Sequence, residues 1–413
     1  MKQPIFRFKG YTDDWEQRKL SSIYNDIGNA FVGTATPYYV EDGHFYLESN
    51  NIKDGQINHN SEIFINEEFY EKQKDKWLHT GDMVMVQSGH VGHAAVIPEE
   101  LNNSAAHALI MFRHPKDKIE PYFLNYEYQT NKSKKKIENI TTGNTIKHIL
   151  ASDMQEFIVD VASYQEQVKI ADWFRKLDNL ISLNQRKCDA LKKLKKGMLQ
   201  KMFPKDGEKV PEFRFKGFTG DWEQCKLGDF GNATGGTSIE SDFAEDGAYK
   251  VISIGSYSED NTYRDQGIRA VESEKTANRV LNKDDITMIL NDKTATGNII
   301  GRVLLIEESG RYVYNQRTER IEVNKEIYAP LFIYEMLNAP HIRDKIVKQC
   351  QGNTQIYVNW STIAMTEYMV PNIEEQRLLG AYFASLDNLI TLHQRKCDAL
   401  KELKKGMLQK MFI

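Results

Sequence analysis

The chain has 413 residues, of which 40% are hydrophobic and 27% charged, so it is long enough for two or three domains with cores of their own. Its formal net charge of −4 is not the overall basic balance of a simple nucleic-acid binder. No apolar run approaches the ~20 residues of a membrane span, no signal segment opens the sequence, and the four cysteines form no metal knuckle. We therefore expect a cytoplasmic protein without a membrane partner.

An internal repeat organises the chain. Residues 6–20 read FRFKGYTDDWEQRKL and residues 213–227 read FRFKGFTGDWEQCKL, with 12 of 15 positions identical. We call these two copies the lead-in motifs. Residues 178–203 (DNLISLNQRKCDALKKLKKGMLQKMF) match residues 387–412 at 23 of 26 positions, at an offset of 209. Such self-similarity predicts two halves built on the same frame.

Smaller echoes keep the offset of 209: Gly143-Asn144-Thr145 with Gly352-Asn353-Thr354, and Glu166-Gln167 with Glu375-Gln376. The regions between the repeated ends, roughly 21–162 and 228–371, share little else. One scaffold that carries two different recognition regions accounts for this pattern. The alternative is an old duplication whose copies diverged.

Each divergent region is predicted to have an α+β fold. Short apolar runs bounded by turn residues predict strands at 82–87, 93–97, 286–290, 299–306 and 320–323. Helices are predicted at 121–128 and 330–338.

Polar loops follow a predicted strand in both regions, and basic or amide-rich segments come later. Amide, hydroxyl and cationic side chains are the types that contact base edges and phosphates in DNA. The candidate DNA contacts are Gln87, Ser88, His90, His93, Lys134, Lys135, Asn144, Thr145 and Lys147 in the first region, and Lys293, Thr294, Thr296, Arg302, Arg317, Arg320, Asn353 and Gln355 in the second. The other interpretation is an ordinary polar surface loop.

Two long helices are predicted at 163–203 and 372–413, and a polar linker between the two halves of the chain is predicted at 204–212. Ser163-x-x-Glu166 and Asn372-x-x-Glu375 are capping-box patterns that mark the two helix starts. In the first helix, Leu177, Asn184, Leu191 and Met198 fall at heptad position a, Leu180, Lys187, Leu194 and Lys201 at d, and Ile181, Cys188 and Met202 at e. The pattern favours antiparallel pairing of the two helices, and docking of each on a separate partner chain stays open.

Motifs of a complete active site are missing. Residues 231–238 read GNATGGTS, which puts Thr237 where a phosphate-binding loop needs its lysine. The sequence contains no nucleophile elbow, metalloprotease motif, methyltransferase motif or nuclease core. We therefore expect a protein that is not an enzyme, has no catalytic residues and no metal site, and binds no cofactor itself.

The doubled pattern resembles the specificity (S) subunits of type I restriction-modification systems. The lead-in motifs are similar to the segments that precede the family's target-recognition domains. Residues 234–238 (TGGTS) are similar to its Gly-Gly-Thr-Pro segment with Ser in place of Pro, and Gly33-Thr34 with Pro37 is a weaker match. The Gly-Asn-Thr segments, the Glu-Gln pairs and the LKKGMLQKMF helix ends complete the resemblance, which covers nearly the whole chain.

The resemblance implies two target-recognition domains joined by a pair of long antiparallel coiled-coil helices, with a pseudo-two-fold internal repeat. The expected segments are 1–162 (lead-in motif and first domain), 163–203 (helix), 204–212 (linker), 213–371 (lead-in motif and second domain) and 372–413 (helix). Each domain would read one half of a bipartite, gapped site in double-stranded DNA.

The family's partners are two methyltransferase (M) subunits and the restriction (R) subunits. S-adenosylmethionine, ATP and Mg would belong to those subunits. The helices and lead-in motifs would dock the methyltransferase, with candidate partner contacts at Trp15, Trp222, Arg186, Lys187, Arg395 and Lys396. The competing interpretations are an enzyme that itself methylates or cuts DNA, and a coiled-coil scaffold that binds proteins without reading DNA.

Overall fold

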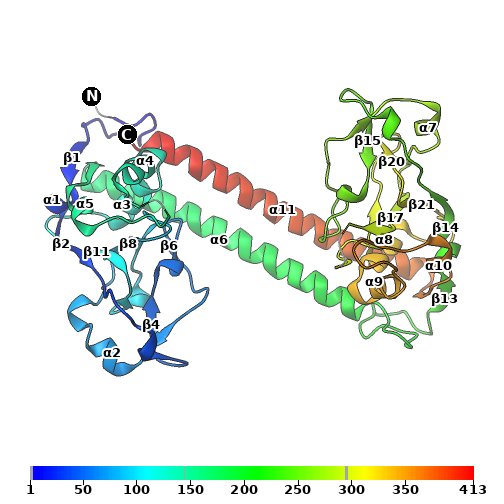
Figure 1. Cartoon of the computed structure of the whole chain (residues 1–413), viewed down its shortest axis with the longest axis horizontal. Helices are drawn as coiled ribbons and strands as arrows, with labels where there is room; N and C mark the ends of the chain where they lie inside the picture. The colour runs from blue at the N-terminus through cyan, green and yellow to red at the C-terminus, as the bar shows by residue number, and fades with distance from the viewer. Residues whose placement is uncertain (1–2, 144, 294–295) are drawn as a thin grey trace. The chain divides into compact units, whose positions relative to one another are not determined.

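A computed structural model describes every residue except 1–2, 144 and 294–295. The chain forms two compact units: residues 1–185 with 395–413, and residues 186–394. Two long helices, α6 (Tyr164–Lys201) and α11 (Ile373–Met411), each contribute to both units (Figure 1). Within the described residues, no helix combines the length and apolarity required to cross a membrane.

The first unit is built on an antiparallel sheet with the order β2-β11-β8-β9. Its strands are β2 (Tyr24–Asn29), β11 (Leu109–Pro115), β8 (Met83–Val86) and β9 (Ala94–Val96). All four residues of β8 are buried, as expected for a strand covered on both faces. The smaller pairings are β10 (Ala105–Ala106), β4 (His44–Leu47), β7 (Phe64–Ile65) and β3 (Tyr39–Val40) in one sheet, β5 (Ile52–Lys53) with β6 (Gln56–Ile57), and β1 (Glu16–Lys19) with β12 (Ile158–Val161).

Local signals set the helices of this unit. Helix α3 (Pro121–Tyr128) begins with a proline, whose missing N–H costs nothing at a first helical position. Helix α4 (Asn131–Ile140) begins after Thr130, whose hydroxyl accepts a hydrogen bond from the backbone N–H of Ser133 at 3.1 Å. The shorter helices are α1 (Leu20–Ile23), α2 (Glu67–Glu71) and α5 (Ala151–Glu156).

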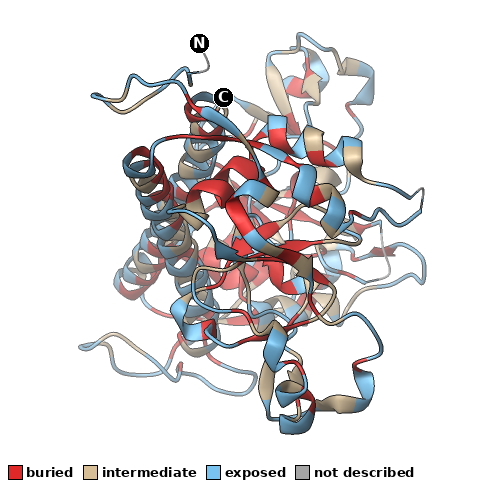
Figure 2. Ribbon diagram, turned by 90° about the vertical axis from the view of Figure 1, so that its left-hand side faces the viewer, coloured by how far each residue is buried: buried red, intermediate tan, exposed pale blue. Residues whose placement is uncertain are grey.

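The second unit repeats this topology. Its main sheet has the order β14-β21-β17-β19, with β14 (Gly231–Gly235), β21 (Thr318–Val323), β17 (Ile286–Ile289) and β19 (Val303–Leu305). The other strands are β16 (Arg269–Ala270), β15 (Tyr249–Ile252) and β20 (Tyr312–Tyr314) in one sheet, β18 (Asn291–Asp292) with β22 (Ile356–Tyr357), and β13 (Glu223–Lys226) with β23 (Glu367–Val370). Its helices are α7 (Glu274–Ala277), α8 (Pro330–Asn338), α9 (Pro340–Val347) and α10 (Trp360–Ile363). Figure 2 shows the buried central strands and the exposed loops.

Two regions with little sequence in common therefore have the same fold. The predicted helices at 121–128 and 330–338 are confirmed as α3 and α8. The single strand predicted at 299–306 is wrong, since only Val303–Leu305 is extended. The chain turns at Gly301, where φ is +72° and a Cβ atom would lie 2.8 Å from Ile346 Cγ2. That left-handed turn, which favours glycine, separates 299–300 from the strand.

The heptad register predicted for α6 is partly wrong. Leu177, assigned to position a, is 5% exposed, but the d-position residues Leu180 and Leu194 are 48% and 40% exposed. Cys188, assigned to position e, is fully buried, and so is Cys397 in α11. The buried seam therefore uses the predicted a and e positions. The hydrophobic pattern alone did not separate d from e, because apolar residues stand at both positions.

Each unit takes its core from both repeats. In the first unit the ring of Trp15 packs edge-on against Phe123 and against Phe412, at the end of α11. In the second unit Trp222 packs in the same way against Phe332 and Phe203, at the end of α6. The repeated helix ends thus complete the core of the opposite half.

The repeated Glu-Gln pairs connect the frame to each domain. Arg7 donates to both carboxylate oxygens of the buried Glu166, at 2.7 and 2.8 Å, and Arg214 does the same to Glu375, at 2.8 and 2.7 Å. The predicted capping boxes are therefore incomplete, because arginines bind the glutamates. The neighbouring Gln167 accepts from the backbone N–H of Glu120, just before α3, at 2.9 Å.

Candidate nucleic-acid interface

A basic pocket forms in the first unit, where the β8–β9 loop lies against α4. It has a volume of about 380 Å³, and we call it the basic pocket. Four of the predicted DNA contacts line it: His90, His93, Lys134 and Lys147. Because these residues come from three separate segments of the chain, the fold concentrates positive charge that is dispersed in the sequence.

His93 is the half-buried donor of the basic pocket. Its Nδ1 accepts a hydrogen bond from the backbone N–H of Asp54 at 3.2 Å. Burial lowers the pKa of the imidazole below its ordinary value, so the neutral ring predominates near pH 7. With Nδ1 accepting, the proton of the neutral ring is on Nε2, which leaves Nε2–H as a donor.

The lysines of the basic pocket differ in their pairing. Lys147 forms an ion pair with Glu138 at 3.2 Å, and both side chains are more than half exposed, so solvent screens this pair. Lys134 is exposed, on the solvent side of α4. It forms no ion pair with any residue that the structure describes.

The remaining first-unit candidates lie near this loop. Gln87 and Ser88 are half-buried at the end of β8, and Lys135 and Thr145 are exposed. Asn144 lies outside the described residues. The glycine before it, Gly143, has φ +98°, and a Cβ atom there would lie 2.2 Å from the carbonyl oxygen of Ile146. The Gly-Asn-Thr echo therefore marks a turn that only glycine fits.

The second-unit candidates fall into two groups. Lys293, Thr296, Arg317, Asn353 and Gln355 are exposed. Arg302 and Arg320 are half-buried and bound by their own unit. Thr294 lies outside the described residues.

Intramolecular contacts occupy those two arginines. Arg302 Nε donates to the carbonyl oxygen of Asn298 at 2.7 Å, and burial, together with the nearby Arg343, lowers its pKa to about 10. Arg320 Nε donates to the buried carboxylate of Asp285 at 2.8 Å. Both guanidinium groups serve the fold of the second unit, so a DNA contact by either would have to replace these bonds.

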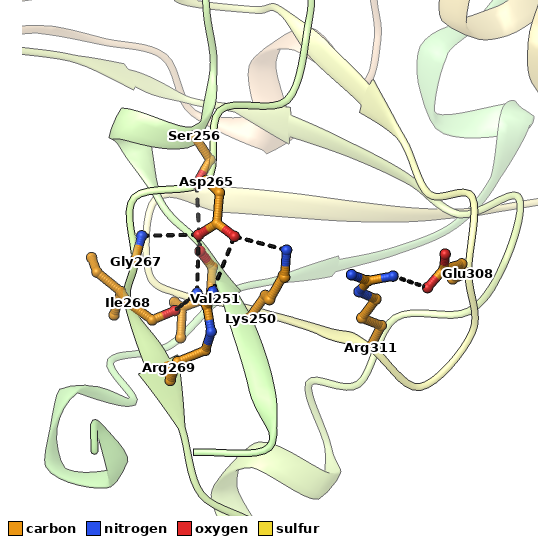
Figure 3. A network of polar contacts seen from close by, with 9 residues as sticks. All are labelled: Lys250, Val251, Ser256, Asp265, Gly267, Ile268, Arg269, Glu308 and Arg311. Atoms are coloured by element: carbon orange, nitrogen blue, oxygen red, sulfur yellow. Dashed lines mark hydrogen bonds and ion pairs between the residues drawn. The ribbon is translucent and has the colours of Figure 1, made fainter. Parts of the chain in front are cut away.

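A second set of cations in this unit is also neutralised. Asp265 accepts from Lys250 at 2.7 Å and from two nitrogens of Arg269 at 3.0 and 3.1 Å, as Figure 3 shows. These cations and the backbone N–H of Gly267 hold the pKa of Asp265 well below its ordinary value. Arg311 pairs with Glu308 beside them. This network fixes the loop between β15 and β16.

Among the described residues, no three His, Cys, Asp or Glu side chains gather where they could hold a metal ion.

Comparison with known proteins identifies the family. The family model for the type I restriction modification DNA specificity domain matches the chain twice, at residues 12–193 and 219–402. The chain belongs to this family. Both matches begin within a lead-in motif and continue through a divergent region and most of a long helix, so the repeat is two specificity domains in tandem.

Relatives and a solved structure agree with this membership. The type I restriction enzyme MjaVIII specificity subunit of Methanocaldococcus jannaschii is 23% identical over 409 residues, covering 96% of this chain and 91% of the relative. The putative MjaX specificity subunit of the same organism is 24% identical over 410 residues, covering 96% and 92%. The crystal structure of a type I restriction-modification S subunit from M. genitalium aligns with a TM-score of 0.64 at 14% identity, covering 100% and 99% of the two chains.

In this specificity subunit the six candidate partner residues divide by burial. Trp15 and Trp222 are each 3% exposed, so their rings complete the cores and their segments could meet a partner only through exposed neighbours. The basic pairs Arg186-Lys187 on α6 and Arg395-Lys396 on α11 are exposed. Each pair directly precedes a buried cysteine, so both repeats carry the same two positive charges at this place.

Sequence reasoning missed Arg343 and Glu138. Arg343 is the repeat equivalent of Lys134, and Arg302 that of His93, at the same offset of 209. Following that offset through the divergent regions would have found both pairs. Glu138 has no such signal in the sequence, because it meets Lys147 only after the chain turns at Gly143 and brings Lys147 back to α4.

Proposed function

We propose that this specificity subunit reads a bipartite, gapped site in double-stranded DNA, one half with each unit. The observation that carries the proposal is a duplicated frame around different loops: both units have the same sheet order, but the segments after β8 and β17 differ in length and charge. Two linked half-site readers gain affinity through effective concentration. The candidate contacts are the exposed and half-buried loop residues described above.

The proposed domain limits are those of the sequence analysis, with target-recognition domains in 1–162 and 213–371. We propose further that α6 and α11 form an antiparallel coiled coil. Contacts inside each unit support this: Cys188 Sγ lies 3.5 Å from Gln394 Oε1, and Cys397 Sγ lies 3.5 Å from Gln185 Oε1. Two ion pairs, Lys404 with Asp178 and Lys195 with Asp387, also join the helices in the register expected for antiparallel pairing.

The long helices are also proposed to dock two methyltransferase subunits. Leu180, Leu183 and Leu194 on α6 are 48%, 44% and 40% exposed. Their equivalents Leu389, Leu392 and Leu403 on α11 are 44%, 45% and 46% exposed. Two matching apolar faces beside matching basic pairs suit two copies of one partner. In this scheme the chain is non-catalytic and works in the cytoplasm, and the methyltransferase supplies S-adenosylmethionine while the restriction subunits use ATP and Mg.

The test of DNA reading is a map of methylated bases in cells with and without this gene, with the partner genes intact. A gapped, two-part methylated motif should vanish with the gene. Replacing residues 228–371 with the equivalent region of another specificity subunit should change one half of the motif and leave the other. An unchanged methylation map in cells that express the methyltransferase would overturn the proposal and favour a scaffold without DNA reading.

The test of docking is co-purification with the methyltransferase subunit. Leu180→Gln with Leu389→Gln should abolish co-purification, because a buried amide without a partner destabilises an apolar interface. Circular dichroism should show unchanged helix content, since both leucines are exposed. Full co-purification of the double variant would contradict the assignment of this face.

A further inference from the structure

We propose that the basic pocket of the first unit binds one phosphodiester group of the DNA backbone, and that the second unit has no equivalent site. The inference rests on the proposed DNA reading and assigns a ligand chemistry to one place in it. Under this proposal, the residues of the basic pocket contact the DNA backbone and position the subunit on it. The other candidate residues are available to contact bases.

The donor inventory of the basic pocket favours a phosphate. Lys134 brings an ammonium group, and His93 brings Nε2–H in its neutral form. The one hydroxyl in the lining, on Thr141, already donates to the carbonyl oxygen of Ile137 at 2.7 Å. The one carboxylate, on Glu138, accepts from Lys147. Base edges present donors and acceptors, whereas a phosphodiester presents acceptors alone, so the phosphate is the better complement.

Packing under the loop shapes the basic pocket. Gly92 has φ +86°, and a Cβ atom there would lie 2.9 Å from Ile137 Cγ2 on α4. The β8–β9 loop therefore lies close against the helix that carries Lys134. The backbone N–H of Gly89 donates to the carbonyl oxygen of Lys147 at 3.0 Å, which brings the third segment to the loop. The cations are thus positioned by main-chain contacts before any ligand arrives.

The second unit also has basic residue types at these two positions, but its own chain binds them. Arg302 and Arg343 stand at the repeat positions of His93 and Lys134, offset by 209. From Ile289 to Gly301 this loop has six residues more than its counterpart from Val86 to Gly92.

The longer loop supplies backbone acceptors for both arginines, and Asn261 Oδ1 accepts a further bond from Arg302. Arg343 Nη1 donates to the carbonyl oxygens of Gly297 and Ile300, both at 3.0 Å. Arg302 donates to the carbonyl oxygen of Asn298. Backbone carbonyls thus take the position that we assign to a phosphate in the first unit. The residues at these two positions hold a loop in the second unit and are open to a ligand in the first.

The test uses the complex with its methyltransferase and a duplex that carries the methylated motif. Each neutralised phosphate contributes about 0.9 to the slope of log affinity against log salt. Lys134→Gln should lower the magnitude of this slope by about that amount and leave the methylated motif unchanged. The control, Lys72→Gln, removes an exposed lysine just after the last residue of α2, which does not line the basic pocket, and should leave the slope as it is.

Single methylphosphonate substitutions, which neutralise one backbone phosphate at a time, locate the contact. The wild-type complex should lose affinity at one position in the first half-site to which the Lys134→Gln complex is insensitive. A wild-type slope for Lys134→Gln, or the same methylphosphonate profile in both complexes, overturns the phosphate assignment. A changed base preference in one half-site also overturns it, because a base contact then replaces the phosphate contact. If the wild-type complex shows no preference for the motif, the proposed function itself fails.

Discussion

Lys404 Nζ lies 2.7 Å from Asp178 Oδ1, and this ion pair joins α11 to α6 within the first unit. Lys195 and Asp387 form the same pair in the second unit, at 2.6 Å. The third partner differs between the units. The hydroxyl of Tyr126 donates to Asp178 at 2.8 Å, whereas Glu335, at the repeat position of Tyr126, lies 2.9 Å from Lys195. The repeated Lys–Asp pair thus contacts a neutral tyrosine in the first unit and a glutamate in the second.

This difference predicts that Lys195→Gln and Lys404→Gln respond differently to pH. Burial raises the pKa of Glu335 to about 7, and Lys195 opposes the rise. Without Lys195, the carboxylates of Glu335 and Asp387 face each other, so Glu335 takes up a proton more readily. A raised folded-state pKa means that stability is highest below the unfolded value and falls as pH rises through the folded one.

We therefore expect Lys195→Gln to destabilise the second unit by about 3 kcal/mol at pH 8 and by much less at pH 5. Lys404→Gln is the matched control, because the neutral Tyr126 stands at the position that Glu335 holds in the second unit. Hydrogen exchange of peptides from each unit, measured at both pH values, separates the two effects. Equal losses at pH 5 and pH 8 for Lys195→Gln would contradict the role of Glu335.

The Arg7–Glu166 pair predicts a large effect from one substitution in the lead-in motif. Glu166 is 0% exposed, so Arg7→Gln leaves a buried carboxylate without its cation. We expect the free energy of unfolding of the first unit to fall by about 3–5 kcal/mol. Urea denaturation with hydrogen exchange as the local probe measures this loss. The double variant Arg7→Gln/Glu166→Gln should recover much of it, and a double variant as unstable as the single one would show that packing dominates.

Glu127 predicts a pH dependence of stability in the first unit. Burial raises its pKa to about 8 from an ordinary value of 4.5. Its Oε1 accepts from the backbone N–H of Asp160 at 3.0 Å, and its buried Oε2 has no hydrogen-bond partner among the residues that the structure describes. Because the folded-state pKa is raised, wild-type stability is fully present below pH 4.5 and falls by about 1.4 kcal/mol per pH unit as pH rises to 8.

Glu127→Gln should remove that decline, so the variant should be the more stable protein at pH 8.5. Thermal melts between pH 5 and pH 8.5 make the comparison. Glu127→Met is a second variant, since Met336 stands at the repeat position of the second unit. Parallel pH profiles for wild type and Glu127→Gln would show that the carboxyl group does not titrate in this window.

Alanine substitutions at two glycines of the second unit distinguish steric crowding from backbone strain. Gly301 and Gly310 have φ values of +72° and +73°. A Cβ atom at Gly301 would lie 2.8 Å from Ile346 Cγ2, whereas a Cβ atom at Gly310 would have no described atom within 4 Å. Gly310→Ala should cost about 1 kcal/mol, the penalty of a left-handed conformation. Gly301→Ala should cost at least 1 kcal/mol more, because Ile346 must move from the core. Equal chemical-denaturation midpoints for the two variants would contradict the crowding.

Much of the frame is legible in the sequence because its signals are local or repeated. Proline at the first helical position marks α3 and α8, and a short, mostly apolar run marks β17. The two Glu-Gln pairs were visible as a repeat, but their function was not. The glutamates meet Arg7 and Arg214, which are 159 and 161 residues away, so no local capping rule describes them.

The sequence by itself determined that this protein is doubled, that two near-identical helices follow two unlike regions, and that the whole resembles a specificity subunit. The tertiary structure decided which helix face is buried and which cations are free. Charge is a property of a residue, but its availability depends on acceptors that the fold brings near. Arg320 donates to Asp285 and Arg302 donates to the carbonyl oxygen of Asn298, whereas in the described structure no acid pairs with Lys134.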